Sequence, residues 1–128
     1  MTAENAIQLM ALLLIKHFVC DFLFQTGRIA RTKHKALQME SYFHTGMHAL
    51  FAVIVLGMLG YHSFWYLGIL SGGIHYGIDY TKGHVNDHLF PDPANMFNRN
   101  HFWWILGADQ LCHSFTYLLM TWFIAKLS

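Results

Sequence analysis

The chain has 128 residues, a length that suits one domain; 12% of them are charged and 55% are hydrophobic. Soluble domains carry about 25% charged residues, so this composition indicates an integral-membrane protein rather than a soluble one. The formal net charge is +1, no nucleic-acid motif is present and the two cysteines form no CxxC spacing, which argues against a nucleic-acid partner and a disulfide framework.

Four apolar segments follow one another, each close to the ~20 residues that cross a bilayer. They are Asn5–Thr26, Tyr42–Gly60, Ser63–Tyr80 and His101–Lys126. The first lacks the basic start and the cleavage site of a signal peptide, so we expect it to be retained. A tight hairpin is expected near Gly60, and an irregular segment or a short surface helix over 82–100, which holds Pro91 and Pro93. The predicted fold class is all-α, a four-helix transmembrane bundle formed by a single domain, residues 1–128.

Basic residues near the segment ends predict the orientation of this bundle. The first and third connections share a side and hold Arg28, Arg31, Lys33, Lys35, Lys82 and Arg99, whereas the other side has Lys126 alone. Because cytoplasmic connections carry an excess of Lys and Arg, we predict both connections in the cytoplasm and both termini on the non-cytoplasmic side. The expected location is the cell inner membrane, as a multi-pass protein within the lipid bilayer.

One spacing recurs in every segment, namely two His or Asp residues four positions apart. The pairs are His17 with Asp21, His44 with His48, His75 with Asp79, and Asp109 with His113. On an α-helix this spacing places both side chains on one face, one turn apart. With a rise of ~1.5 Å per residue, all eight residues fall in the cytoplasmic half of the bilayer. His44 and Asp79 are expected at the edge of this group and the other six at its centre.

Ionisable side chains cost roughly 2.5–3.5 kcal/mol each inside a bilayer on insertion scales and usually serve a function there. A single pair of this kind is more often a structural hydrogen bond, but four pairs at one depth favour a common metal centre. Five His and three Asp suit a divalent metal, with zinc as the first expectation and iron or manganese as alternatives. A mononuclear zinc site takes four ligands, so eight candidates imply two ions, or one ion with outer residues that orient the imidazoles. Asp21 and Asp109 are the candidate catalytic proton acceptors.

Polar and small residues beside the pairs suggest further contacts. The candidates for substrate binding are Gln25, Gln110, Lys82 and Arg28. The two glutamines could equally bond between helices, and the two basic residues, which could attract phosphate, are also explained by topology alone. Lys16 could contact an anion or extend to the interface, in a direction about 100° from that of His17. Six glycines allow close helix contacts, within one chain or across a homo-oligomer: Gly57, Gly60, Gly68, Gly72, Gly73 and Gly77.

The segments HFVCDFLFQT, HTGMHAL, HYGIDYTK and DQLCH resemble, in that order, the signature of a family of small bacterial and phage membrane proteins, domain-of-unknown-function family 3307. The resemblance covers nearly the whole chain. It implies attention, without assigned roles, to His17, Asp21, Gln25, His48, His75, Asp79, Asp109, Gln110 and His113. More loosely, the layout is similar to that of membrane-bound metal-dependent hydrolases.

The predicted function is a membrane-embedded metal-dependent hydrolase with a mono- or dinuclear site, acting on a small-molecule or lipid substrate that is lipid-linked or phosphorylated. Three alternatives stay open: a di-iron membrane oxidoreductase, a transporter of divalent cations or protons, and a structural or interaction protein whose bundle a metal staples. The HxxHH clusters of membrane desaturases are absent from the chain. A transporter is disfavoured because the outer half of the predicted bundle offers almost no polar residues.

Overall fold

The computed structural model describes residues 1–27, 29, 33, 35, 38–91 and 99–128. Its long helices are α1 (Ala3–Phe18), α3 (Met39–Met58), α4 (Trp65–Leu89) and α5 (Asn100–Leu127). A π-helix, η1 (Val19–Leu23), continues α1, and a 3-10 turn, η2 (His62–Phe64), precedes α4. The predicted all-α architecture with four packed helices is therefore confirmed over the described part of the chain.

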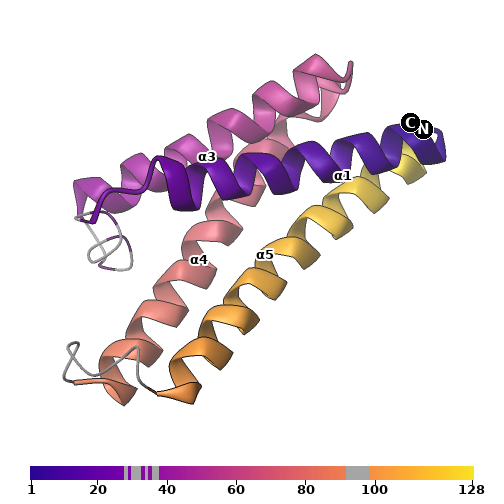
Figure 1. Cartoon of the computed structure of the whole chain (residues 1–128). Helices are drawn as coiled ribbons and strands as arrows, with labels where there is room; N and C mark the ends of the chain where they lie inside the picture. The colour runs from indigo at the N-terminus through magenta and orange to yellow at the C-terminus, as the bar shows by residue number, and fades with distance from the viewer. Residues whose placement is uncertain (28, 30–32, 34, 36–37, 92–98) are drawn as a thin grey trace.

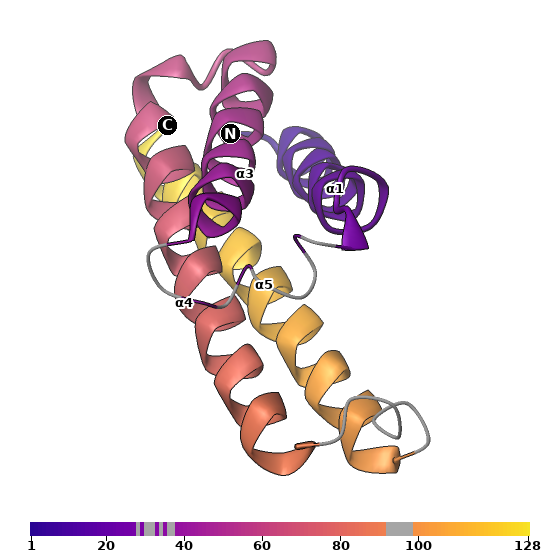
Figure 2. The same ribbon diagram turned by 90° about the vertical axis from the view of Figure 1, so that its left-hand side faces the viewer.

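The four helices pack as a ring, in which α1 contacts α3 and α5, while α4 contacts α3 and α5 from the other side. In Figure 1, α4 and α5 run side by side and α1 crosses them at an angle. Figure 2 shows α1 nearly along its own axis, next to the steeper α3. The two termini lie at the same end of the bundle in both views. One face of each helix is buried and lines the interior.

Local signals in the sequence set several of these helix ends. The Thr2 side-chain oxygen accepts a hydrogen bond from the Asn5 amide at 3.2 Å and caps the start of α1. Gly60 has φ +80°, a conformation that favours glycine, and the Tyr61 amide reaches back to the Leu56 carbonyl at 2.7 Å. This cap ends α3 and makes the predicted tight hairpin to α4.

Two of the six glycines bring α3 and α4 into close contact. A Cβ atom added to Gly68 would lie 2.7 Å from Val53 Cγ2, and one added to Gly72 would lie 2.7 Å from Ala49 Cβ. The other four, Gly57, Gly60, Gly73 and Gly77, have no heavy atom of the described residues within 4 Å of such a Cβ. Close helix contact through glycine therefore occurs within this chain at two positions.

The predicted bounds of two helices are wrong in a way that matters for the site. α4 continues to Leu89, beyond the predicted end at Tyr80, so Lys82 lies on the helix rather than in an irregular segment. α3 begins at Met39, before the predicted Tyr42. The prediction followed hydropathy, but a helix can extend beyond its apolar stretch until a proline stops it, and the first proline after α4 is Pro91.

The interior of the bundle has two layers. The apolar layer lies toward the end that holds the termini and consists of Leu9, Leu13, Ala52, Val55, Leu56, Leu67, Tyr117, Met120 and Ile124. On each helix the His and Asp pair lies next to this layer. On α5, for example, His113 lies one turn from Tyr117. The apolar layer packs the helices together, and the polar layer is held between them.

Two helical stretches are long and apolar enough to cross a membrane, namely Ala3–Leu23 and Met39–Met58. This is weak evidence on its own, because the core helix of a soluble protein can have the same length and composition. α4 and α5 carry more polar residues and do not meet the same criterion among the described residues. The four-span topology and its orientation remain predictions.

Candidate metal centre

The structure brings the eight predicted ligands, His17, Asp21, His44, His48, His75, Asp79, Asp109 and His113, into one cluster. None of the eight is more than 6% exposed. Each helix contributes one pair, because the four-residue spacing keeps both side chains of a pair on the face turned inward. We refer to these eight residues as the His/Asp cluster.

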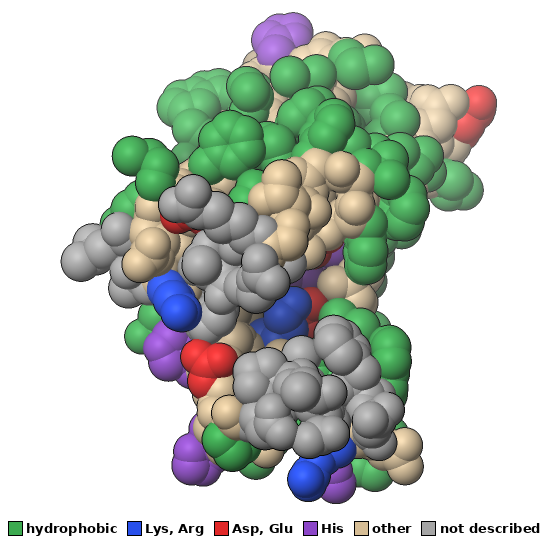
Figure 3. Space-filling model, turned by 60° about the vertical axis from the view of Figure 1, so that its left-hand side comes forward, with side chains coloured by type: hydrophobic (Ala, Val, Ile, Leu, Met, Phe, Trp, Pro, Cys, Tyr) green, Lys and Arg blue, Asp and Glu red, His purple; other side chains and the backbone are tan. Residues whose placement is uncertain are grey.

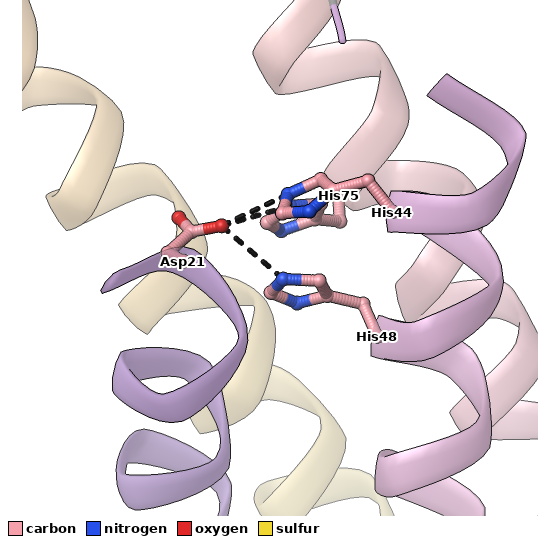
Figure 4. A group of neighbouring side chains, drawn as sticks. All are labelled: Asp21, His44, His48 and His75. Carbon is pink, nitrogen blue, oxygen red and sulfur yellow. Dashed lines mark hydrogen bonds and ion pairs between the residues drawn. The ribbon is translucent and has the colours of Figure 1, made fainter. Parts of the chain in front are cut away.

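The first ligand set of the cluster is centred on Asp21, at the π-helical end of α1. Its Oδ1 lies 2.9 Å from His44 Nε2, 3.2 Å from His48 Nε2 and 3.6 Å from His75 Nε2. Figure 4 shows the three imidazoles, from α3 and α4, all facing this one carboxylate. One carboxylate and three imidazoles, with ligand atoms within 4.8 Å of one another, could hold a metal ion.

A second set lies between α4 and α5 and consists of Asp79, Asp109 and His113. His113 Nε2 is 3.4 Å from Asp109 Oδ1 and 3.9 Å from Asp79 Oδ1. A third set, His17 with His75 and His113, overlaps the other two. The rings of His75 and His113 stack at 4.2 Å between centroids, so the two carboxylate-containing sets adjoin through neighbouring imidazoles.

Several buried atoms of the cluster are held by ion-pair contacts and have no well-directed hydrogen bond among the described residues. His48 Nε2 lies 3.2 Å from Asp21 Oδ1, Asp79 Oδ2 lies 2.9 Å from Lys33 Nζ, and Asp109 Oδ1 lies 3.4 Å from His113 Nε2. A divalent cation would satisfy these atoms together, and imidazole with carboxylate is a donor set that suits zinc, iron or manganese.

The expectation that His44 and Asp79 lie at the edge of the group is wrong. Each is 1% exposed, and the two lie 3.4 Å apart between His44 Nε2 and Asp79 Oδ2. The depth prediction placed them near helix ends, whereas α3 begins earlier and α4 ends later than predicted. Both residues therefore belong to the centre of the cluster.

Lys33 is a member of the site that sequence reasoning missed. Its ammonium group lies 2.9 Å from Asp79 Oδ2, 3.4 Å from Asp21 Oδ1 and 3.3 Å from His44 Nε2. The side chain is 6% exposed although it comes from the connection between η1 and α3. The sequence offered no signal for this, because Lys33 counted only as one of several basic residues near a helix end.

Lys16 and Tyr117 form an outer layer behind the ligands. Lys16 Nζ donates to Tyr117 Oη at 2.9 Å and lies 3.2 Å from Nδ1 of His48, the ring nitrogen that faces away from Asp21. Tyr117 Oη is also 3.2 Å from His17 Nδ1. The sequence held a signal for Tyr117, since it continues the face of His113 by one more turn.

The four candidates for substrate binding have different surroundings. Gln110 Oε1 is 3.2 Å from His17 Nε2, and its amide group donates to Asp109 Oδ2 at 3.0 Å. Lys82 donates to the same Asp109 oxygen at 2.9 Å. Gln25 lies beyond η1, with its side-chain oxygen buried and unbonded among the described residues, and Arg28 falls outside the described residues. Gln110 and Lys82 are thus joined to the cluster through Asp109.

The charges of this buried region are balanced. With neutral histidines, its three carboxylates are matched by three ammonium groups. Lys33 and Lys82 pair directly with carboxylates, and Lys16 lies behind His48. On the face drawn in Figure 3, basic, acidic and His side chains meet in a recess that has hydrophobic side chains beside it. Of the two cysteines, Cys20 is buried and Cys112 is exposed.

The matching family model covers residues 9–128 and is described as a protein of unknown function (DUF3307). The chain belongs to the DUF3307 family. No curated protein and no solved structure matches the chain, so no named relative supports the looser similarity to metal-dependent hydrolases. In this DUF3307 protein, the four motif segments that resembled the family signature are the segments that supply the buried cluster.

Proposed function

We propose that this DUF3307 protein is a membrane-embedded metal-dependent hydrolase that acts on a lipid-linked or phosphorylated substrate. The observation that carries the proposal is the overlap of three His/Asp ligand sets, all buried and built from all four long helices. A chain of this size has no evident reason to bury eight such residues together unless their chemistry is used.

The surface around the cluster supports a membrane location. Large apolar side chains are exposed along the outward faces of the helices, for example Phe22 at 53%, Leu119 at 63% and Trp122 at 57%. Soluble monomers seldom expose such extended apolar area. Together with the positive-inside distribution of Lys and Arg, this supports a cluster in the cytoplasmic half of the bilayer.

The donor sets support a site for one or two divalent ions. Asp21, His44, His48 and His75 would hold the first, and Asp79, Asp109 and His113 the second. His17 has both ring nitrogens in contact with other side chains, Tyr117 and Gln110. It therefore fits better as a residue that orients the ligands than as a ligand itself.

Between the two candidate proton acceptors, the contacts favour Asp109. Asp21 faces three imidazoles and fits the role of a ligand. Asp109 Oδ2 is held by Lys82 and Gln110, which orients the buried Oδ1 beside His113 Nε2 at 3.4 Å. With an ion in the first set alone, this oxygen could take a proton from water. The chemistry that a bound divalent ion supplies at such a site is polarisation of a phosphoryl or acyl oxygen and acidification of water.

Elemental analysis of the purified protein tests the proposal. We expect one or two divalent ions per chain, a clear loss of metal in His48→Ala, and no loss in His62→Ala, whose side chain is exposed near the α3–α4 turn. With metal-loaded protein, release of phosphate from a lipid phosphate should fall about 10²–10⁴-fold in Asp109→Asn, the range for loss of a general base. Protein that takes up no stoichiometric metal contradicts the proposal.

The main rival is a protein whose metal only staples the bundle, and one observation favours it. The ligands join all four long helices, so an ion would add an interhelical link that a small membrane protein can use. On that reading Asp109→Asn loses metal and thermal stability together and there is no hydrolysis to lose. Hydrolysis that disappears in Asp109→Asn while the first set keeps its ion excludes the rival.

A further inference from the structure

A second feature of the molecule adjoins the cluster, namely a groove of about 560 Å³ along the seam between α4 and α5. Its walls are mostly apolar or small side chains. The α4 side of the lining includes Ile74, Ile78 and Lys82, and the α5 side includes Ala108, Asp109 and Cys112. A groove of this volume is within the range of sites for small molecules and lipid chains.

The groove opens on the outer side of the seam between α4 and α5. On α4, Ile74, Ile78 and Val85 lie on a flank turned by roughly 100° from the face of His75 and Asp79. Ile74 is 41% exposed and Val85 is 38% exposed. In a bilayer this flank faces the hydrocarbon region, so a lipid chain can enter the groove from the side.

The mostly apolar groove adjoins the cluster through Asp109, which belongs to both. Asp109 Oδ2 lies 2.9 Å from Lys82 Nζ, and Oδ1 lies 3.4 Å from His113 Nε2. The Lys82 side chain is 17% exposed, and its ammonium group also lies 3.5 Å from Asp79 Oδ1. The Thr81 hydroxyl bonds to the Gly77 carbonyl of its own helix. Lys82 is therefore the basic side chain beside a molecule in the groove, and it contacts the proposed ligand Asp109.

The charge balance predicts the sign of the group that binds there. Three carboxylates and three ammonium groups cancel in the metal-free cluster when the histidines are neutral. One divalent ion then leaves two uncompensated positive charges in apolar surroundings, where charge interactions are strong. An anionic group reaching Lys82 from the groove would offset them.

We propose that the α4–α5 groove binds the hydrocarbon chain of a membrane lipid that carries a phosphate headgroup, with the phosphate at Lys82 and facing the cluster. This rests on the proposed function and specifies its substrate as a long-chain lipid phosphate. Lys82 is a substrate-binding residue in this arrangement, and Ile78, Ala108 and Cys112 contact the chain. Binding requires the groove, whereas hydrolysis requires the cluster, so the two can be tested separately.

Cys112 gives a direct measure of groove occupancy. It is exposed and lines the groove, while Cys20 is fully buried, so Cys112 is the reactive thiol of the unmodified chain. The experiment follows maleimide labelling of zinc-loaded protein in phosphatidylcholine vesicles. We expect added dodecyl phosphate to slow labelling several-fold, and butyl phosphate and dodecyl maltoside to leave the rate unchanged.

Three variants sharpen this experiment. Lys82→Met should remove the protection by dodecyl phosphate, and Ala108→Phe should fill the groove and remove the dependence on added lipid while metal content stays normal. In the control, Leu111→Cys combined with Cys112→Ser, the thiol is exposed on α5 beside the groove but outside its lining. Labelling at this position should not respond to dodecyl phosphate.

The outcomes separate this inference from the proposed function. Equal protection by dodecyl maltoside, or protection that grows with protein concentration instead of lipid phosphate, would overturn the inference in favour of unselective lipid binding or a second copy of the chain. Hydrolysis of lipid phosphate without protection of Cys112 would contradict lipid binding in the groove and would support the proposed hydrolase activity. Protection of Cys112 without metal uptake or hydrolysis would support lipid binding in the groove and contradict the proposed hydrolase activity.

Discussion

Lys33 places a positive charge among the oxygen and nitrogen atoms that a metal ion would use. Its ammonium group lies 2.9 Å from Asp79 Oδ2 and 3.4 Å from Asp21 Oδ1. A divalent ion entering this space is repelled by the ammonium group and competes with it for the same carboxylates. We therefore expect Lys33→Met to bind zinc about tenfold more tightly, equivalent to about 1.4 kcal/mol, in a competition titration against a chelator.

The control for this prediction is Lys35→Met, in the same connection. The Lys35 side chain is exposed, and its carbonyl, which accepts a hydrogen bond from Ser41 Oγ, is unaffected by the substitution. Zinc affinity should not change in this variant. Weaker zinc binding in Lys33→Met would show that the ammonium group supports the ligands by orienting the carboxylates instead of competing for them.

Tyr117 is a residue whose effect on metal binding should be indirect. Its hydroxyl group contacts both Lys16 Nζ and His17 Nδ1 from behind the ligands. Loss of such an outer contact typically lowers metal affinity about 10–100-fold, so Tyr117→Phe should weaken zinc binding by a factor in that range. In the matched variant Tyr76→Phe the hydroxyl belongs to a tyrosine outside the cluster, and zinc affinity should be unchanged. Native zinc affinity in Tyr117→Phe would show that the hydroxyl group has no role in metal binding and that Tyr117 only packs in the apolar layer.

At the scale of elements, the contact between α3 and α4 depends on single glycines. A methyl group at Gly72 would lie 2.7 Å from Ala49 Cβ and 3.2 Å from the Thr45 carbonyl oxygen, so the helices would have to separate. We expect Gly72→Ala to destabilise the protein by about 1–3 kcal/mol. The neighbouring Gly73→Ala meets open space and should stabilise by about 0.5–1 kcal/mol. Thermal unfolding of metal-free protein measures both, and equal shifts would contradict the close contact.

The helices themselves could be predicted from the sequence, but their ends only in part. The short connection between the second and third apolar segments correctly predicted the hairpin, and Gly60 supplies the positive φ at the end of α3. Hydropathy misplaced the end of α4, since polar residues such as Lys82 can continue a helix beyond its apolar part. The late predicted start of α3 moved His44 to the edge of the site, and the early predicted end of α4 did the same for Asp79.

For the whole molecule, the meeting of the four pairs was predictable because a four-helix bundle has one interior. Each pair marks the inward face of its helix, so the pairs can only meet there. What the sequence could not provide was the contribution of side chains outside this periodicity. Lys33 reaches the cluster from a connection, and the α4–α5 groove depends on the packing of two helix flanks, which no spacing in the sequence encodes.

A metal that links all four helices must also change the stability of the whole bundle. An ion that binds only the folded state stabilises it by RT ln(1 + [L]/Kd), about 2.7 kcal/mol at a free concentration of 100 Kd. Zinc should therefore raise the unfolding temperature of the purified protein, and a chelator should reverse the rise. His48→Ala should abolish this shift because it removes a ligand of the first set, whereas the exposed His62→Ala should keep it. An unfolding temperature that zinc leaves unchanged in the native chain would mean that the buried His/Asp cluster is held by its three lysines and hydrogen bonds without an ion.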